Sequence, residues 1–410
     1  MTAVTPQDHL VQHISKIPAN EGESVNLFVR EYDGTQNNQP REPVLMLHGR
    51  SVPVLAGFDL DVPGADIDYN WAHQLAAKHH YDVFMMDLQG NGRSPRPKMD
   101  DPRNANPAQR DILVPNPLPE PYTGLPNYPH QLSNTGSEEA ELATVVDYIM
   151  AQPRMTTPIE FIGWSAAATA MGPYALQHPE NVKSLFLLAP IFPPQGRWSG
   201  DASNPFDLPP RTQMPVSDPA VLYGFPMFVN SKSGFTVGWD RETGSPLQRD
   251  PGMGDRAWAA MMENDPIGSK WGPETSPGVF EGIHRYRNTF GWGWTNQTVP
   301  LRDPSGNAIL GDRVPTIIVY GELDKTANTP ATTPVPTALR FSVPALYTAI
   351  HGPNKLMFQL AGAGHSVVWE RPAKYVHDIS FQWLHNKGKV WGLTSGSYYR
   401  DAYGEVTPLE

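Results

Sequence analysis

Residues 159–170 read IEFIGWSAAATA, and this stretch decides the fold. Its first half is a short apolar run rich in isoleucine and phenylalanine, which predicts a buried strand. Its second half is a row of small residues dominated by alanine, which predicts the start of a helix. Almost no loop separates the two halves, so the chain must turn within two or three residues. Ser165 occupies that turn.

A turn this sharp constrains the residues around Ser165. The turning residue is forced into a strained backbone conformation, and its neighbours must be small so that strand and helix can approach closely. Gly163 and Ala167, two residues to either side, meet this requirement. The serine then stands at a helix N-terminus, where the helix dipole and free N–H groups favour a developing negative charge. The pattern is therefore typical of a displayed, nucleophilic serine.

The composition of the 410-residue chain excludes several classes of protein. The net charge of −11 and the lack of a basic run argue against a nucleic-acid-binding surface. The chain has no cysteine, which excludes disulfides, thiolate nucleophiles and cysteine-based metal sites. The thirteen histidines show no HExxH or comparable spacing, so we expect no metal and no other cofactor.

No stretch of the sequence predicts membrane insertion or export. Residues 1–22 lack the apolar segment of a signal peptide, so we expect a cytoplasmic protein. The longest apolar run, at residues 185–189, is far shorter than the roughly 18 residues that a membrane span needs. The oligomeric state has no signature in the sequence.

Strands and helices alternate on both sides of residues 159–170. Further strands are predicted at 43–47, 81–86, 182–189, 315–320 and 355–360, and helices at 71–80, 137–151 and 373–386. Strands that are apolar throughout are typical of a parallel sheet buried on both faces. The alternation predicts an α/β fold with a mostly parallel central sheet flanked by helices.

Four other segments depart from this rhythm. Residues 1–22 predict a loosely ordered arm, although the alternating strand at 23–32 could form a hairpin with it. Residues 95–134 hold ten prolines, which forbid helix interiors and central strands, so we expect a long functional loop within the core. Residues 190–314 show little periodicity and hold six of the eleven tryptophans. Residues 387–410 give no clear prediction.

A serine is a weak nucleophile at neutral pH unless a histidine takes its proton and a carboxylate orients that histidine. Asp324 follows the predicted strand at 315–320, and His365 follows the one at 355–360. Because the carboxyl ends of parallel strands share one edge of a sheet, both side chains should converge on Ser165. Ser165, His365 and Asp324 are therefore the predicted catalytic residues.

Some site assignments have alternatives or partners elsewhere in the chain. Glu322, two residues before Asp324, stays open as the acid. The chemistry also needs N–H donors for an oxyanion, which we expect from the backbone of Ala166 and of Arg50. Trp164, directly before the serine, is the predicted substrate-binding residue.

Taken together, these features resemble the α/β-hydrolase family, in its serine-nucleophile, esterase- or lipase-like branch. The resemblance rests on the His48-Gly49 loop, the Asp87…Gly90-x-Gly92-x-Ser94 turn, the Gly163-Trp164-Ser165-Ala166-Ala167 turn, Gly321-x-x-Asp324, Gly364-His365 and the order Ser, Asp, His. It covers residues 23–189 and 310–386 and departs from the family at Ala167, usually glycine, and Gln89, usually arginine. It implies a structural role for His48. It also implies a core of residues 1–189 and 315–410, with residues 190–314 inserted as a large cap.

The predicted function is a serine hydrolase that cleaves a carboxylic ester or lactone of a fairly apolar small molecule through an acyl-enzyme intermediate. Other activities that would use the same three catalytic residues remain possible: thioesterase, amidase or aminopeptidase, and acyltransferase. An aminopeptidase would need carboxylates in the cap, where Glu263, Asp265 and Glu281 form no evident pair. A non-catalytic small-molecule-binding protein with this fold is the alternative from another class.

One arginine, Arg50, and one cationic stretch, residues 284–287, could hold a substrate anion. The Arg50 side chain could pair with a substrate carboxylate, although an orientation to solvent or a core ion pair is the favoured expectation. Residues 284–287, HRYR, could do the same, but a solvated face of a cap helix is the default interpretation.

Overall fold

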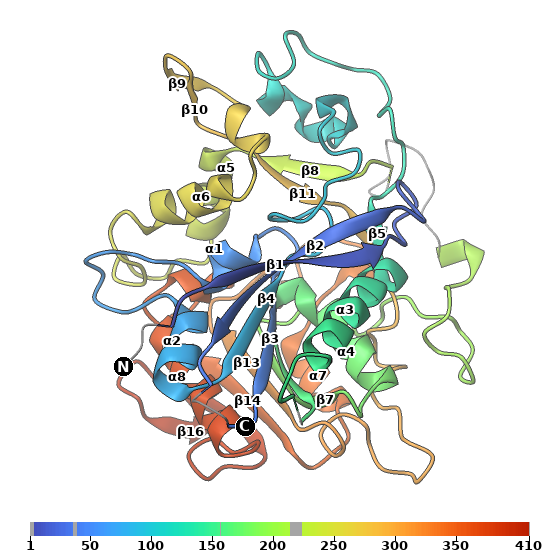
Figure 1. The fold of residues 1–410 in the computed structure, drawn as a ribbon, viewed down its shortest axis with the longest axis vertical. Coiled ribbons are helices and arrows are strands. Elements are labelled where there is room, and N and C mark those ends of the chain that lie inside the picture. The colour runs from blue at the N-terminus through green and yellow to red at the C-terminus, as the bar shows by residue number, and fades with distance from the viewer. Residues whose placement is uncertain (1–3, 36–38, 156, 214–223, 410) are drawn as a thin grey trace.

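A ten-stranded sheet forms the centre of the computed structural model, which describes residues 4–35, 39–155, 157–213 and 224–409 (Figure 1). In spatial order its strands are β1 (Gln7–Ile14), β2 (Ser24–Asp33), β4 (Asp82–Met86), β3 (Pro43–Leu47), β6 (Ile159–Trp164), β7 (Val182–Leu188), β13 (Thr316–Gly321), β14 (Lys355–Leu360), β15 (Gly396–Arg400) and β16 (Val406–Pro408). From β4 to β15 all neighbours are parallel, while the β1–β2, β2–β4 and β15–β16 pairs are antiparallel. The predicted mostly parallel sheet is confirmed.

Helices cover both faces of this sheet (Figure 1). They are α2 (Trp71–His79) and α8 (Ala373–His385) on one face, and α3 (Thr135–Met150), α4 (Ala168–Gln177) and α7 (Val343–Ala349) on the other. Successive side chains of a strand point to opposite faces, so in β3 Val44 and Met46 join the first core, and Leu45 and Leu47 the second. Burial on both faces explains why the central strands are apolar throughout. No helix in the described ranges combines the length and apolar character needed to cross a bilayer.

The edges of the sheet differ from the sequence prediction. Residues 7–14 form β1, which pairs antiparallel with β2 from Gln7↔Glu31 to Ile14↔Ser24. The predicted arm is therefore wrong, and the hairpin is confirmed. The sequence of β1 does not predict a strand, because its apolar residues do not all lie on a buried face: Leu10 and Ile14 are 67% and 52% exposed. Near the other edge, β15, the second strand from the end of the sheet, is mostly half-buried, so its sequence pattern is equally weak.

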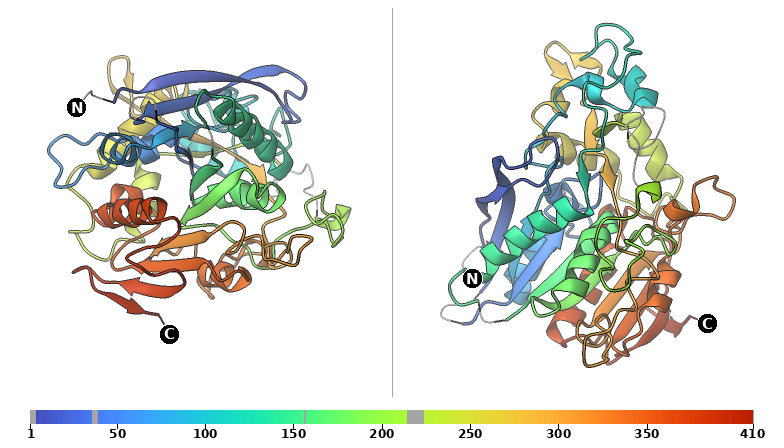
Figure 2. Two further views of the ribbon diagram at one scale, coloured as in Figure 1. Left: turned by 60° about the horizontal axis from the view of Figure 1, so that its bottom comes forward. Right: turned by 90° about the vertical axis from the view of Figure 1, so that its right-hand side faces the viewer.

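A second layer of smaller elements lies at one end of the molecule (Figure 2). Its elements are β8 (Met227–Asn230), β11 (His284–Arg287), α5 (Lys232–Asp240), α6 (Met253–Glu263), β9 (Glu274–Ser276) and β10 (Val279–Phe280). β8 and β11 pair antiparallel, so the interpretation of HRYR as a solvated helix face is wrong. Three of its four residues are buried, because the arginines among them have buried carboxylate partners that the sequence pattern cannot show.

Shorter elements complete the described fold. They are α1 (Val54–Phe58), β5 (Ser133–Asn134), β12 (Thr289–Phe290) and the 3-10 helices η1 (Pro102–Asn104), η2 (Pro107–Leu113), η3 (Ser165–Ala167), η4 (Arg211–Gln213), η5 (Gly268–Lys270), η6 (Thr337–Leu339) and η7 (Val367–Trp369). The proline-rich residues 95–134, which include η1 and η2, pack on the second layer: Asn106 N–H donates to the Met227 carbonyl at 2.9 Å. Leu113 and Leu132 share a buried apolar cluster with Met227 and Trp271.

Arg285 joins the proline-rich segment to the second layer. Its guanidinium, in a residue 2% exposed, donates to both carboxylate oxygens of Asp265 at 2.9 and 2.6 Å. The same group donates to the Met99 carbonyl at 2.7 Å and to Asp100 at 2.8 Å, and it lies 4.8 Å from the centre of the Trp271 ring. Removing Arg285 takes both of these hydrogen bonds from the buried Asp265 carboxylate and leaves Arg96 as its ion-pair partner among the described residues.

We predict that Arg285→Leu lowers the free energy of unfolding by about 3 kcal/mol or more, since breaking a buried ion pair costs roughly 3–5 kcal/mol. Arg256→Leu is the matched control, because Arg256 makes a partly exposed pair with Glu263 at 3.2 Å and should cost less than about 1 kcal/mol. Urea unfolding followed by tryptophan fluorescence measures both losses. Equal losses in the two variants would contradict the role assigned to Arg285.

Candidate active site

The turn at Ser165 has the strained geometry that the sequence predicts. β6 ends at Trp164, and η3 and α4 follow without a loop. Ser165 has a φ of 58°, in the left-handed region that non-glycine residues rarely adopt. A Cβ added to Gly163 would lie 3.0 Å from the Ala167 Cβ and from the Met171 Sδ, so a side chain there would push strand and helix apart.

The structure brings Ser165, His365 and Asp324 together in one hydrogen-bonded series. His365 Nε2 lies 2.8 Å from Ser165 Oγ, and His365 Nδ1 lies 3.0 Å from Asp324 Oδ2. With the proton on Nδ1, the imidazole donates to the carboxylate and accepts from the serine hydroxyl. The three residues follow β6, β14 and β13, whose carboxyl ends lie at the same edge of the sheet.

The geometry decides between the two acidic candidates. Asp324 is fully buried at its side chain, and its second oxygen accepts the N–H groups of Thr326 and Ala327 at 3.0 and 2.7 Å. These bonds hold the carboxylate facing His365. Glu322 instead accepts the Gly362 N–H at 3.0 Å, away from the imidazole. Of the two candidates, Asp324 is the carboxylate that lies within hydrogen-bond distance of His365.

The loop at His48, Gly49 and Arg50 lies directly beside the serine. His48 is buried, which lowers its pKa to about 3, and its Nε2 accepts the Leu88 N–H at 3.0 Å. The ring is therefore neutral, and its Nδ1–H donates to the Gly49 carbonyl. A Cβ on Gly49 would lie 3.1 Å from the Ser165 Cβ, so glycine permits the close approach. His48 fixes the loop, as the resemblance implies.

The remaining predicted site residues, Arg50, Ala166 and Trp164, line a cavity with Ser165. Ala166 stands in the first helical turn, where N–H groups have no intrahelical acceptor. Trp164 is only 2% exposed, and its indole N–H donates to the His365 carbonyl at 3.1 Å, so it mainly supports the histidine loop. The Arg50 guanidinium forms no ion pair with any described residue; it lies 5.0 Å from the Phe228 ring centre.

Two buried glutamates that the sequence analysis did not single out hold the loop of His365. Glu242, which follows α5, accepts the His365 N–H at 2.7 Å with one oxygen. Its other oxygen accepts the Lys325 N–H at 3.0 Å and the Thr326 hydroxyl at 2.8 Å, beside Asp324. Glu370 accepts the Gly364 N–H at 2.8 Å. Glu242 thus connects the loops that carry the acid and the base, across 123 residues of sequence.

Charges around His365 also affect the pKa of its imidazole. Burial alone would lower the pKa of the imidazole, but the charge and hydrogen bond of Asp324, with the charges of Glu242 and Glu370, raise the pKa above its ordinary value of 6.5. A histidine that acts as a base must be neutral. Loss of reactivity on acidification should therefore begin above the pH expected of an unperturbed histidine.

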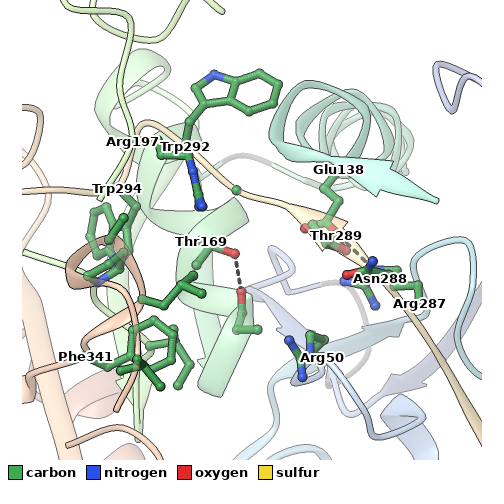
Figure 3. A pocket seen from close by; sticks show the side chains of 17 residues that line it. Arg50, Glu138, Thr169, Arg197, Arg287, Asn288, Thr289, Trp292, Trp294 and Phe341 are labelled. Carbon is green, nitrogen blue, oxygen red and sulfur yellow. Dashed lines mark hydrogen bonds and ion pairs between the residues drawn. The ribbon is translucent and has the colours of Figure 1, made fainter. Parts of the chain in front are cut away.

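Two adjoining cavities open at this site. The first has a volume of about 690 Å³ and is bounded by Ser165, His365 and residues of α5 and the 325–341 segment. The second, of about 300 Å³, lies beyond Ala166 and is shown in Figure 3. The residues common to both are Arg50, Ala166, Ile191, Val335, Leu339 and Phe341. Across the described part of the chain, no group of three or more histidine, aspartate or glutamate residues could hold a metal ion.

Comparison with known protein families identifies the family to which this chain belongs. The sequence model described as alpha/beta hydrolase fold matches residues 42–372. The chain therefore belongs to the alpha/beta hydrolase fold family, and this membership supports a hydrolase. No curated protein matches the sequence.

Several solved structures are similar to this chain at low sequence identity. A serine hydrolase from Cycloclasticus zankles is 15% identical with a TM-score of 0.46, over 93% of this chain and 99% of that one. An esterase from Thermogutta terrifontis is 13% identical with a TM-score of 0.44, over 93% and 100%. A carboxylesterase from Bacillus subtilis is 11% identical with a TM-score of 0.46, over 93% and 92%. The family assignment rests on the sequence model and not on these structures.

We predict that Glu242→Gln moves the acidic limb of Ser165 reactivity to lower pH, because loss of a negative charge lowers the pKa of His365. The rate at alkaline pH should also fall by about tenfold. The reason is that the new amide N–H₂ group would face backbone N–H or hydroxyl groups that donate hydrogen bonds to the carboxylate in the wild-type protein. The pH dependence of the rate of labelling by a fluorophosphonate probe measures both effects. Glu263→Gln, an exposed change, is the control; identical pH profiles for all three proteins would disprove the role of Glu242.

Proposed function

We propose that this protein is a serine hydrolase that cleaves a carboxylic ester or lactone through an acyl-enzyme intermediate. The observation that carries the proposal is the series Ser165–His365–Asp324, with its hydroxyl on a strained turn at the edge of a cavity. A hydrogen-bonded imidazole that is oriented by a carboxylate is the arrangement that activates a serine hydroxyl.

In the proposed first half-reaction, Ser165 Oγ attacks the substrate carbonyl carbon while His365 Nε2 takes the hydroxyl proton. The N–H groups of Ala166 and Arg50 hold the oxyanion of the tetrahedral intermediate. The imidazolium, stabilised by Asp324, then gives its proton to the leaving alkoxide, and the acyl-enzyme forms. In the second half-reaction, a water molecule attacks the acyl-enzyme carbonyl while His365 takes a proton from that water. His365 then returns the proton to Ser165 Oγ, and the carboxylic acid leaves.

The second layer would act as a cap over this chemistry. Phe235 and Trp239 of α5 line the first cavity together with Ser165, and Glu242 connects the same segment to the histidine loop. The cap that we propose comprises residues 190–314, with the packed segment 95–134 beside it. An enclosing apolar wall excludes water from the oxyanion and strengthens the hydrogen bonds to it.

Three carboxylates of this cap, Asp265, Glu263 and Glu242, do not favour an aminopeptidase, which needs a free carboxylate for a substrate ammonium. Asp265 is bound by both Arg285 and Arg96, and Glu263 pairs with Arg256. Both oxygens of Glu242 already accept hydrogen bonds. The described lining of the first cavity therefore supports an uncharged or anionic substrate more than a cationic one.

Ser165→Ala should reduce kcat for 4-nitrophenyl butyrate by about 10⁴-fold or more, as removal of a nucleophile from such a unit does. His365→Gln should cause a loss of the same order, and the double variant should be little worse than either single one, because the residues act together. Thermal melting checks that each variant is folded. If folded Ser165→Ala retained wild-type turnover, the mechanism would be wrong; ligand-induced stabilisation of wild-type protein without turnover would instead favour a binding protein.

A further inference from the structure

The second cavity carries positive charge that ester cleavage itself does not require. Arg50, Arg197 and Arg287 line it from three different parts of the chain, with Glu138 as the carboxylate among the described lining residues (Figure 3). Most of the remaining wall is apolar, with Trp292 and other large side chains. The whole chain has a net charge of −11, so this local excess of cations runs against its composition.

Glu138 is ion-paired with Arg287, so it offsets at most one of these three positive charges. Its Oε1 accepts from Arg287 Nε at 2.8 Å, from the Ser133 hydroxyl at 3.0 Å and from the Thr289 hydroxyl at 2.9 Å, so its charge is already shared by three donors. Arg287 is 3% exposed, and its buried Nη1 has no hydrogen-bond partner among the residues that the structure describes. A buried donor left unpaired is costly, which favours an acceptor that reaches this group.

Arg50 supplies a positive charge at the junction of the two cavities. It has no ion pair with a described carboxylate and lines both cavities. Its guanidinium is held over the rings of Phe228 and Tyr286, at 5.0 and 5.5 Å from their centres. Stacking on two aromatic faces restricts the side chain before any ligand arrives, so binding costs less conformational entropy.

The first cavity is also lined by more positive than negative side chains. Arg241 and Lys325 line it, and its carboxylate, Glu242, is saturated by backbone and hydroxyl donors. A cleft lined by one sign of charge concentrates ligands of the opposite sign and disfavours those of its own sign.

We propose that the second cavity binds an anionic group of the substrate, with a carboxylate as the matching chemistry. The substrate is then an ester or lactone with an apolar body and an ionised acid at one end. Guanidinium groups offer paired N–H donors that match the two oxygens of a carboxylate. This proposal rests on the proposed function, because it assumes that the scissile carbonyl lies at Ser165.

Two pairs of matched esters test the proposal on either side of the scissile bond. The first is the mono-4-nitrophenyl ester of adipic acid against its methyl-capped diester, and the second is the butyrate of 4-hydroxybenzoate against that of its methyl ester. We expect kcat/KM for the acidic member to exceed that of the neutral member by about tenfold or more in at least one pair. Equal or higher values for the neutral member in both pairs would overturn the anion site.

Arg50→Met should bring the ratio of acidic to neutral kcat/KM close to one. The ratio is taken within each variant, so a general change in rate cancels. Arg313→Met is the matched control, because Arg313 is exposed, pairs with Asp303 and lines neither cavity. It should keep the wild-type ratio, and an unchanged ratio in Arg50→Met would also overturn the proposal.

A binding measurement separates failure of this proposal from failure of the proposed function. If wild-type protein cleaves neither ester of either pair, the proposed function fails. The anion site is then tested by thermal stabilisation of Ser165→Ala with adipate, against 1,6-hexanediol of equal carbon number. A larger stabilisation by adipate that disappears on adding Arg50→Met supports the site; equal stabilisation by the two compounds overturns it.

Discussion

The strained turn at Ser165 is the constraint on which the rest of the structure depends. A left-handed conformation at a residue with a side chain costs about 1–3 kcal/mol, and it persists because β6 and α4 are both buried around it. The surrounding residues are small where the turn requires it. Gly163 allows the helix to approach its strand, and Gly49 allows the neighbouring loop to lie against the serine. The displayed hydroxyl is thus a consequence of core packing.

A displayed hydroxyl needs a base that is held as firmly as the turn. The two loops that carry Asp324 and His365 leave adjacent parallel strands, but a sheet edge alone does not fix loop conformation. Glu242 and Glu370 supply the missing constraint through backbone N–H groups. Because Glu242 comes from the second layer, this layer contributes to the geometry of the site and not only to its enclosure.

The sequence predicts the central strands and the convergence of Ser165, His365 and Asp324 because both follow from local rules. Strands buried on both faces are apolar throughout, and residues after parallel strands meet at one edge. The rest depends on contacts between distant residues. Glu242 meets His365 across 123 residues, and the HRYR strand looks solvated until its buried carboxylate partners are known. No periodicity or motif records such pairings.

The most direct test of the account is the site and consequence of covalent modification by a fluorophosphonate. Intact-protein mass spectrometry with peptide mapping should find one adduct per chain, on Ser165, and hydrolysis of 4-nitrophenyl butyrate should be lost in proportion to its formation. Full modification of Ser165 with activity retained, or loss of activity through an adduct on another residue, would contradict the account.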